Sequence, residues 1–264
     1  MKLISWNTNG LRATVKQGNF DPLFKIHKPD ILCLQETKAE AIQLPEEVKN
    51  IKGYTSYFSH SKGRKGYSGV AVYTKIKPER VEEILGIEDL DTEGRLLILY
   101  FAKDALGLDK KSILLNCYFP NGGGGPVRLD YKLRFYDAFL EFIDKKKKEG
   151  YAIIFTGDVN TAHEEIDLAR PKANEENTGF LPIERAWMDE VTAHGYIDTF
   201  RTLYPTKKDM YSYWDQKSGA RDRNVGWRID YFFVSPDIQK HVKDSIMLTD
   251  YYGSDHCPIV LTLK

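Results

Sequence analysis

Short apolar runs recur along the whole chain, and they constrain its fold more than any other feature. Each run is rich in β-branched and aromatic residues and is bounded by turn residues, which is typical of buried β-strands. No Pro/Gly/Ser-rich linker separates them, so the sequence predicts one domain over residues 1–264. The runs are Leu3–Trp6, Ile31–Leu34, Gly69–Tyr73, Leu96–Phe101, Ile113–Phe119, Ile153–Phe155, Tyr231–Val234, Ile246–Leu248 and Ile259–Leu263.

Fewer segments carry a helical pattern. The N-cap and proline of Asp21–Pro22 predict a short helix that ends near His27. Apolar residues recur every three or four positions from Leu129 to Ile143, which predicts a second helix. A third helix is predicted from about Pro182 to His194. The side chains that this third helix is expected to bury are Ile183, Trp187 and Val191. Strands with interspersed helices favour an α/β fold in which two sheets pack face to face with helices outside.

Composition narrows the class of protein. Hydrophobic residues make up 42% of the chain and charged residues 29%, which is typical of a globular protein, and no apolar run approaches a membrane span. The 38 basic and 38 acidic residues cancel, which argues against bulk electrostatic binding of nucleic acid but does not exclude a local basic patch. Cys33, Cys117 and Cys257 are widely spaced in apolar surroundings, so we expect buried thiols in a reducing compartment.

Polar residues stand where the apolar runs end. Asn7 ends the first run, Glu36 follows the second, and Asp158 ends the run that begins at Ile153. Taken singly, an Asp or Asn after a strand is usually a turn residue, and a lone Glu is usually solvated. Their recurrence at several strand ends is what suggests a site.

Asp230 is the hardest of the polar residues to explain by structure alone. It lies inside an apolar run, where a carboxylate is unfavourable by several kcal/mol unless it is paired. His256 is the natural partner, because a carboxylate fixes the tautomer of an imidazole and favours its charged form. Asp255 and His256 are adjacent, so on a strand they point to opposite faces and are not expected to pair.

The set as a whole favours one chemistry. Glu36 and Asp255 are hard oxygen ligands and Asn7 is a neutral one, which suits Mg²⁺ that keeps part of its water shell. Near such an ion, a nearby carboxylate can accept a proton from water and polar donors can stabilise a phosphate. The sequence therefore predicts metal-assisted hydrolysis of a phosphodiester. The residues expected to act on water and phosphate are Asp158, Asn160, His256 and Tyr118.

Six motifs, in order along the chain, closely resemble the exonuclease III family of apurinic/apyrimidinic (AP) endonucleases. They are Ile4–Arg12, Leu34–Lys38, Gly66–Ala71, Gly157–Asn160, Asn224–Tyr231 and Gly253–Pro258. The wider superfamily, which includes deoxyribonuclease I, inositol polyphosphate phosphatases and sphingomyelinases, shares the Glu, Asp-x-Asn and Ser-Asp-His elements. Asn224–Tyr231 and Thr161–Leu168 look like the DNA-repair branch.

This resemblance implies a four-layer α/β sandwich of two face-to-face β-sheets flanked by helices. It implies Mg²⁺- or Mn²⁺-dependent cleavage of double-stranded DNA on the 5′ side of an abasic site, leaving a 3′-hydroxyl, in base excision repair. A 3′→5′ exonuclease or 3′-phosphodiesterase activity is a further expectation. We also expect a monomer without membrane association and, if the chain is prokaryotic, a cytoplasmic protein associated with the nucleoid.

By motif, the resemblance implies a role for each site residue. Glu36 is similar to the main metal ligand, with Asp255, Asn7 and Asn9 nearby; in some members the Asn9 position is acidic. The residues that resemble the catalytic group are Asp158 and Asn160 (water), Asp230 and His256 (phosphate) and Tyr118 (transition state).

A substrate pocket is also implied by the resemblance. Tyr213, Trp227 and Ile229 resemble the apolar wall that accepts a flipped abasic sugar, although ordinary core packing would explain Tyr213 equally well. Two basic segments are candidate contacts to DNA phosphates, with a solvated loop as the alternative for the second. They are Arg221, Arg223 and Arg228 around Trp227, and Lys62, Arg64 and Lys65.

Two departures from the family and two rival functions stay open. Gly122–Gly125 stands where some relatives place a long side chain that wedges into the duplex, so the balance of endonuclease and exonuclease activity is undetermined. Val159 replaces a larger apolar residue, a conservative core change. The rivals are a superfamily enzyme with another substrate, such as intact DNA, deoxyuridine sites or inositol phosphates, and a DNA-binding module without catalysis.

Overall fold

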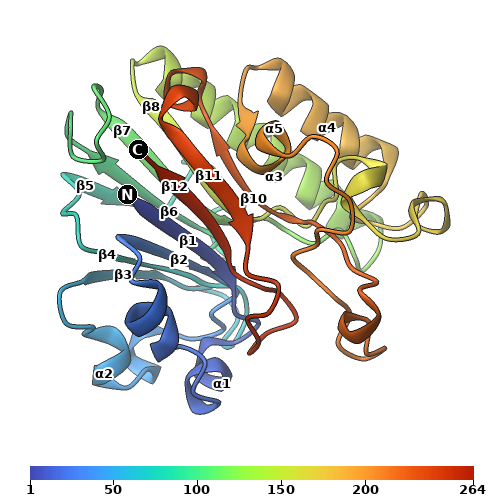
Figure 1. Cartoon of the computed structure of the whole chain (residues 1–264), viewed down its shortest axis with the longest axis horizontal. Coiled ribbons are helices and arrows are strands. Elements are labelled where there is room, and N and C mark those ends of the chain that lie inside the picture. Colours follow the sequence, from blue (N-terminus) through green and yellow to red (C-terminus); the bar gives the residue numbers. More distant parts are fainter.

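Two six-stranded β-sheets face each other, with helices on both outer sides (Figure 1). The computed structural model describes residues 1–264. The strands of the first sheet are β1 (Lys2–Asn7), β2 (Ile31–Gln35), β3 (Thr55–Ser59), β4 (Val70–Thr74), β11 (Val242–Met247) and β12 (Ile259–Leu263). Those of the second are β5 (Arg80–Glu82), β6 (Leu96–Phe101), β7 (Ser112–Tyr118), β8 (Ala152–Asp158), β9 (Ile197–Asp198) and β10 (Asp230–Val234).

The strand order places the longest apolar runs in the middle of each sheet. The orders are β11-β12-β1-β2-β4-β3 and β5-β6-β7-β8-β10-β9. β1 is parallel to β2 and β7 is parallel to β8, whereas the other pairs are antiparallel. Alternate side chains of each strand face opposite sides, so Leu3 packs between the sheets while Ile4 packs under the outer helices. Apolar residues on both faces explain why the central strands read as continuous apolar runs.

Five α-helices complete the layers. They are α1 (Leu11–Lys16), α2 (Glu46–Lys49), α3 (Pro126–Lys148), α4 (Pro182–Ala193) and α5 (Thr199–Leu203). Residues of α1 and α2 pack on the first sheet, and residues of α3 and α4 pack on the second. The predicted four-layer α/β sandwich is thus confirmed (Figure 1). Short 3₁₀-helices lie at residues 41–43, 165–167, 171–173, 221–223 and 236–241.

The short helix predicted after Asp21 ends at His27, as expected, where a left-handed Lys28 follows; its segment Leu23–His27 is π-helical. One detail of the third predicted helix needs correction. Ile183 was expected in the core, but 55% of its surface is exposed. It lies in the first turn of α4, whose buried side chains include Trp187 and Val191 as predicted.

The strands that the sequence did not predict are β3, β5 and β9, and β11 begins four residues earlier than expected. All four are edge strands of their sheets. Edge strands bury only part of their surface, so they lack the apolar runs that identify central strands. The three cysteines are buried and unpaired, as predicted. None of the helices combines the length and the apolar character that a membrane span requires.

Candidate active site

The candidate site is built where central strands of both sheets end. β7 and β8 are parallel and β10 is antiparallel to β8, so Tyr118, Asp158 and Asp230 stand in register across three neighbouring strands. Asn7 ends β1 in the opposite sheet, and its Nδ2 donates a hydrogen bond of 2.8 Å to Asp158 Oδ2. This bond joins the polar ends of the two sheets.

One pocket of about 400 Å³ collects most of the predicted residues. Those that line it are Asn9, Glu36, Tyr118, Asp158, Asn160, Tyr213, Trp227, Ile229, Asp255 and His256. Sequence reasoning did not assign the other lining residues, which are Asn121, Thr178, Gly179 and Asp215. Asn121 had a detectable signal, because it is a polar residue three positions after the buried end of β7. Its Nδ2 donates to Asn160 Oδ1 at 2.9 Å.

Asp158 is buried and surrounded by hydrogen-bond donors. Its Oδ1 accepts from the backbone N–H of Asn160 at 2.8 Å, and its Oδ2 accepts from Asn7. Burial raises the pKa of Asp158 to about 7, although the nearby His256 opposes the rise and Asp230 adds to it. A carboxyl group with a pKa near neutrality is suited to accept a proton from water.

His256 and Asp230 form the predicted pair. His256 Nδ1 lies 2.8 Å from Asp230 Oδ2, and the Ser212 hydroxyl donates to the same oxygen at 2.7 Å. Burial alone lowers the pKa of His256, but the carboxylates of Asp230 and Asp158 raise it to about 10. At neutral pH the imidazole is therefore a cation, with Nε2 3.9 Å from Asp158 Oδ2. Asp255 instead accepts from Asn9 Nδ2 at 3.0 Å, so the neighbouring Asp255 and His256 have different partners, as predicted.

The predicted metal-binding residues fit a hard divalent cation. Carboxylates of Glu36 and Asp255 and amide groups of Asn7 and Asn9 lie within one hydrogen-bonded network. The Lys38 ammonium lies 3.0 Å from Glu36 Oε1 and also contacts Asn9 Oδ1. The ammonium shows that these oxygens attract a positive charge. Oxygen atoms of this kind are also the ligands that Mg²⁺ and Mn²⁺ prefer.

A different trio, Asp158, Asp230 and His256, also offers ligand atoms within 4.8 Å of one another. A metal-binding imidazole must be neutral, and the raised pKa of His256 disfavours that state. The exposed group His163, Glu164 and Asp189 is the second such cluster, and it does not line the pocket.

Three residues of the pocket have a strained backbone. Asn9, Glu36 and Asn160 have φ values of 45°, 50° and 57°, in the left-handed region that non-glycine residues rarely adopt. Such residues persist only where the surroundings hold them, and they concentrate at functional sites. Here the strained backbone turns three polar side chains from different strand ends into one pocket.

An apolar wall closes one side of the pocket. Tyr213 and Trp227 are bridged by backbone pairing, and the Tyr213 ring lies 4.9 Å from the His256 ring. Ile229 and Trp227 pack with a small separate cluster whose buried members include Leu168 and Phe180. The predicted wall is therefore present as a surface, and its contact with a sugar stays a prediction.

The basic residues that were predicted to contact DNA differ in their exposure and in their partners. Arg228 was expected on a nucleic-acid face, but it is buried and pairs with Asp167 and Asp198. Arg221 donates to the carbonyls of Ser254, Thr249 and Tyr251, and so holds the loop before Asp255. The remaining basic residues, Arg223, Lys62, Arg64 and Lys65, are exposed and lie outside the pocket. Contacts of Arg221 and of these four with DNA stay predictions.

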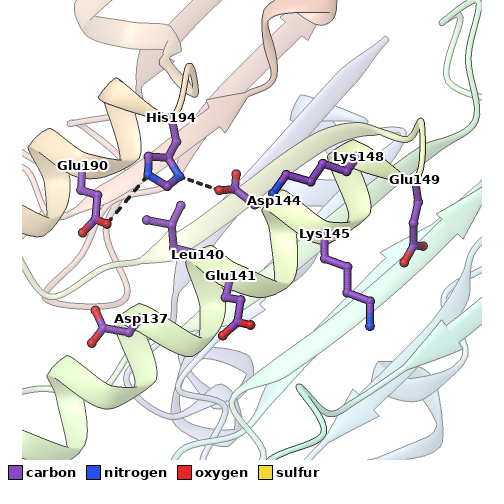
Figure 2. Close-up of a pocket in the computed structure, with 9 residues that line it drawn as sticks. All are labelled: Asp137, Leu140, Glu141, Asp144, Lys145, Lys148, Glu149, Glu190 and His194. Carbon is purple, nitrogen blue, oxygen red and sulfur yellow. Dashed lines mark hydrogen bonds and ion pairs between the residues drawn. The ribbon is translucent and has the colours of Figure 1, made fainter.

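A larger hollow, of about 660 Å³, lies between α3 and α4 and contains none of the predicted residues (Figure 2). Figure 2 shows His194 between two carboxylates. Its Nδ1 lies 2.5 Å from Asp144 Oδ2, and its Nε2 lies 3.8 Å from Glu190 Oε1. Its lining is mostly charged and largely exposed, with Leu140 as the one hydrophobic residue. The His194–Asp144 pair joins the two helices, and this hollow shares no lining residue with the smaller pocket.

Two facing sheets with a polar pocket at their strand ends define the four-layer α/β sandwich class. The chain belongs to the endonuclease/exonuclease/phosphatase family, whose model matches residues 4–256. It is 41% identical to the exodeoxyribonuclease of Bacillus subtilis over the full length of both chains. It is 40% identical to the DNA repair nuclease APEX1 of Danio rerio, covering all of this chain and 82% of that one.

Solved structures agree with this assignment. The AP endonuclease LMAP from Leishmania major superposes with a TM-score of 0.89 at 31% identity, covering all of this chain and 87% of that one. The 3′-5′ exonuclease NExo from Neisseria meningitidis superposes with a TM-score of 0.88 at 26% identity, with both chains fully covered. The family resemblance that the sequence motifs indicated is confirmed.

Proposed function

We propose that this protein is a Mg²⁺- or Mn²⁺-dependent AP endonuclease of base excision repair. It hydrolyses the phosphodiester 5′ to an abasic site in double-stranded DNA, leaves a 3′-hydroxyl, and has 3′→5′ exonuclease or 3′-phosphodiesterase activity. The observation that carries the proposal is one pocket that combines three features. They are Asp158 with a pKa near neutrality, a positively charged His256, and the apolar wall around Trp227. The relatives named exodeoxyribonuclease and AP endonuclease support it.

Each side of the pocket has a task in this reaction. Asp158 accepts a proton from the attacking water, and Asn160 orients that water toward phosphorus. The bond from phosphorus to the departing 3′-oxygen breaks, and that oxygen takes a proton to become the 3′-hydroxyl. His256, kept charged by Asp230, and Tyr118 donate hydrogen bonds to phosphate oxygens whose charge grows in the transition state.

Glu36, Asp255, Asn7 and Asn9 are the residues that would hold the divalent ion. When bound, it would supply positive charge that stabilises the phosphate and the leaving oxygen. Selectivity comes from the apolar wall. A nucleotide without a base flips at little cost, and a small pocket rejects an intact nucleotide.

A nicking assay tests the proposal. Abasic and intact duplexes, and inositol phosphates, are incubated with the protein in Mg²⁺ or EDTA. We expect nicking of the abasic duplex only, and only with the metal. Asp158→Asn should lower kcat by roughly 10²-fold or more, the scale of a lost general base. Equal rates on intact and abasic DNA would favour a general nuclease. Metal-independent binding without nicking would favour a binding module.

Two further properties belong to the same proposal. The protein acts as a monomer, which sedimentation analysis at nicking-assay concentrations tests directly. It works in a reducing compartment, the cytoplasm and nucleoid if the chain is prokaryotic, which its three buried unpaired thiols support. Fractionation of cells that produce the protein would test the location.

A further inference from the structure

A buried ion pair lies directly behind the pocket. Lys132 of α3 and Glu184 of α4 are both fully buried, and their charged groups are in contact. Moving an ammonium and a carboxylate out of water is unfavourable, and an apolar pair of the same size would often stabilise a fold equally well. Stability alone therefore does not explain why charged residues occupy these two positions.

The ammonium of Lys132 is hydrogen-bonded to the loop that carries Asp158 and Asn160. Its Nζ donates to the carbonyl of Asn160 at 2.8 Å and to Thr161 Oγ1 at 2.9 Å. One helical turn later, the Tyr136 hydroxyl donates to the carbonyl of Val159 at 2.7 Å. Because Asn160 has a strained backbone, with φ of 57°, the loop needs such external bonds to keep its shape.

The carboxylate of Glu184 is bonded to a second segment of the pocket, which packs next to the Asn160 loop. Its Oε1 accepts from the Thr178 hydroxyl at 2.8 Å, and its Oε2 accepts from the backbone N–H of Gly179 at 2.6 Å. Thr178 and Gly179 both line the pocket. Gly179 also packs against the Trp227 ring so closely that an added Cβ would lie 3.3 Å from it. Glu184 thus holds the backbone against which the Trp227 wall is set.

We propose that Lys132 and Glu184 are positioning residues, which hold the Asn160 loop and the Gly179 segment at the spacing that the reaction needs. The inference rests on the proposed function. Lys132 acts on the groups that orient water, so its loss should lower kcat. Glu184 acts on the wall that accepts the sugar, so its loss should raise KM. Small misplacements of reacting groups lower rates steeply, by about 10²-fold for about 1 Å.

The test compares Lys132→Met, Glu184→Gln and the double variant with wild type on an abasic duplex in Mg²⁺. For Lys132→Met we expect a kcat loss of about 10- to 100-fold with little change in KM. For Glu184→Gln we expect the KM to rise about tenfold with a smaller change in kcat. Either single variant leaves a buried partner charge and is at risk of unfolding. The double variant has no such charge, and we expect it to fold and to show both effects.

The matched control is Val191→Ala, which removes core packing from α4 without touching the loop or the wall. It should lower the melting temperature while kcat and KM at a permissive temperature stay as in wild type. The inference is wrong if the folded double variant has wild-type kcat and KM, or if its activity loss only follows its melting temperature. A wild-type protein that does not nick abasic DNA would instead overturn the proposed function, and the inference with it.

Discussion

Replacing Asp230 with Asn tests the electrostatics of the pocket most directly. The change keeps the shape of the side chain and a hydrogen-bond acceptor for His256 Nδ1, but it removes the charge. Burial lowers the pKa of an imidazole, but the surrounding carboxylates raise that of His256 to about 10, with Asp230 first and Asp158 and Asp255 after it. In Asp230→Asn the pKa of His256 should fall to its ordinary value of 6.5 or below.

The size of the effect follows from the protonated fraction. At pH 7.5, a group with a pKa near 10 is almost fully protonated, whereas one with a pKa of 6.5 is only about one-tenth protonated. A neutral imidazole that donates its one N–H hydrogen bond from Nδ1 has no proton on Nε2 to donate to the phosphate. Loss of one such donor lowers kcat by about 10²- to 10³-fold. Because about one-tenth of the variant keeps the donor at pH 7.5, we expect kcat to fall about tenfold at that pH.

The assay is single-turnover nicking of an abasic duplex in Mg²⁺ from pH 6 to pH 10, with circular dichroism to verify folding. In wild type, the descending limb of the rate profile should lie near the pKa of His256, at about 10. In Asp230→Asn this limb should move to about 6.5 or below. A limb that stays near 10 in the variant would refute the reasoning.

Ser212→Ala is the matched control for Asp230→Asn. The Ser212 hydroxyl contacts the same Oδ2 atom of Asp230 at 2.7 Å, but it carries no charge. Its removal should leave the position of the descending limb nearly unchanged. A large shift in this control would mean that geometry, and not the carboxylate charge, sets the protonation of His256.

Three further predictions concern the metal, the backbone and acid stability. Glu36→Gln should raise the Mg²⁺ concentration for half-maximal nicking by about tenfold or more, and an unchanged titration would contradict its role. Gly157→Ala should destabilise the fold by about 3 kcal/mol or more in urea unfolding, because a Cβ at its φ of +140° would lie 1.8 Å from the carbonyl oxygen of Cys117. Arg228 and Arg201 lower the pKa of Asp167 from 3.8 to about 2 despite its burial. This carboxylate therefore stabilises the fold above pH 4, and the contribution, about 2 kcal/mol, is lost as the pH falls toward 2. Asp167→Asn should remove that pH dependence, and urea unfolding between pH 2 and pH 5 measures it.

Central and edge strands explain how far the sequence predicts this fold. β1, β2, β6, β7, β8, β10 and β12 are buried on both faces or nearly so, and continuous apolar runs identify them. β3, β5 and β9 lie at sheet edges, where packing needs fewer apolar residues and the local pattern is weak. Ile183 shows the same limit for helices, because helical spacing alone does not tell which end of an apolar stripe reaches the core.

Residue types and their positions in the apolar runs were enough to select the candidates and to show that Asp230 required a partner, because a charge in an apolar strand must be neutralised. The packed fold settled which charges meet. It paired Arg228 with Asp167 and Asp198, bonded Arg221 to backbone carbonyls, and set Lys132 beneath Asn160. The physical reason is that these contacts join segments distant in sequence, so their geometry arises only when the sheets and helices pack.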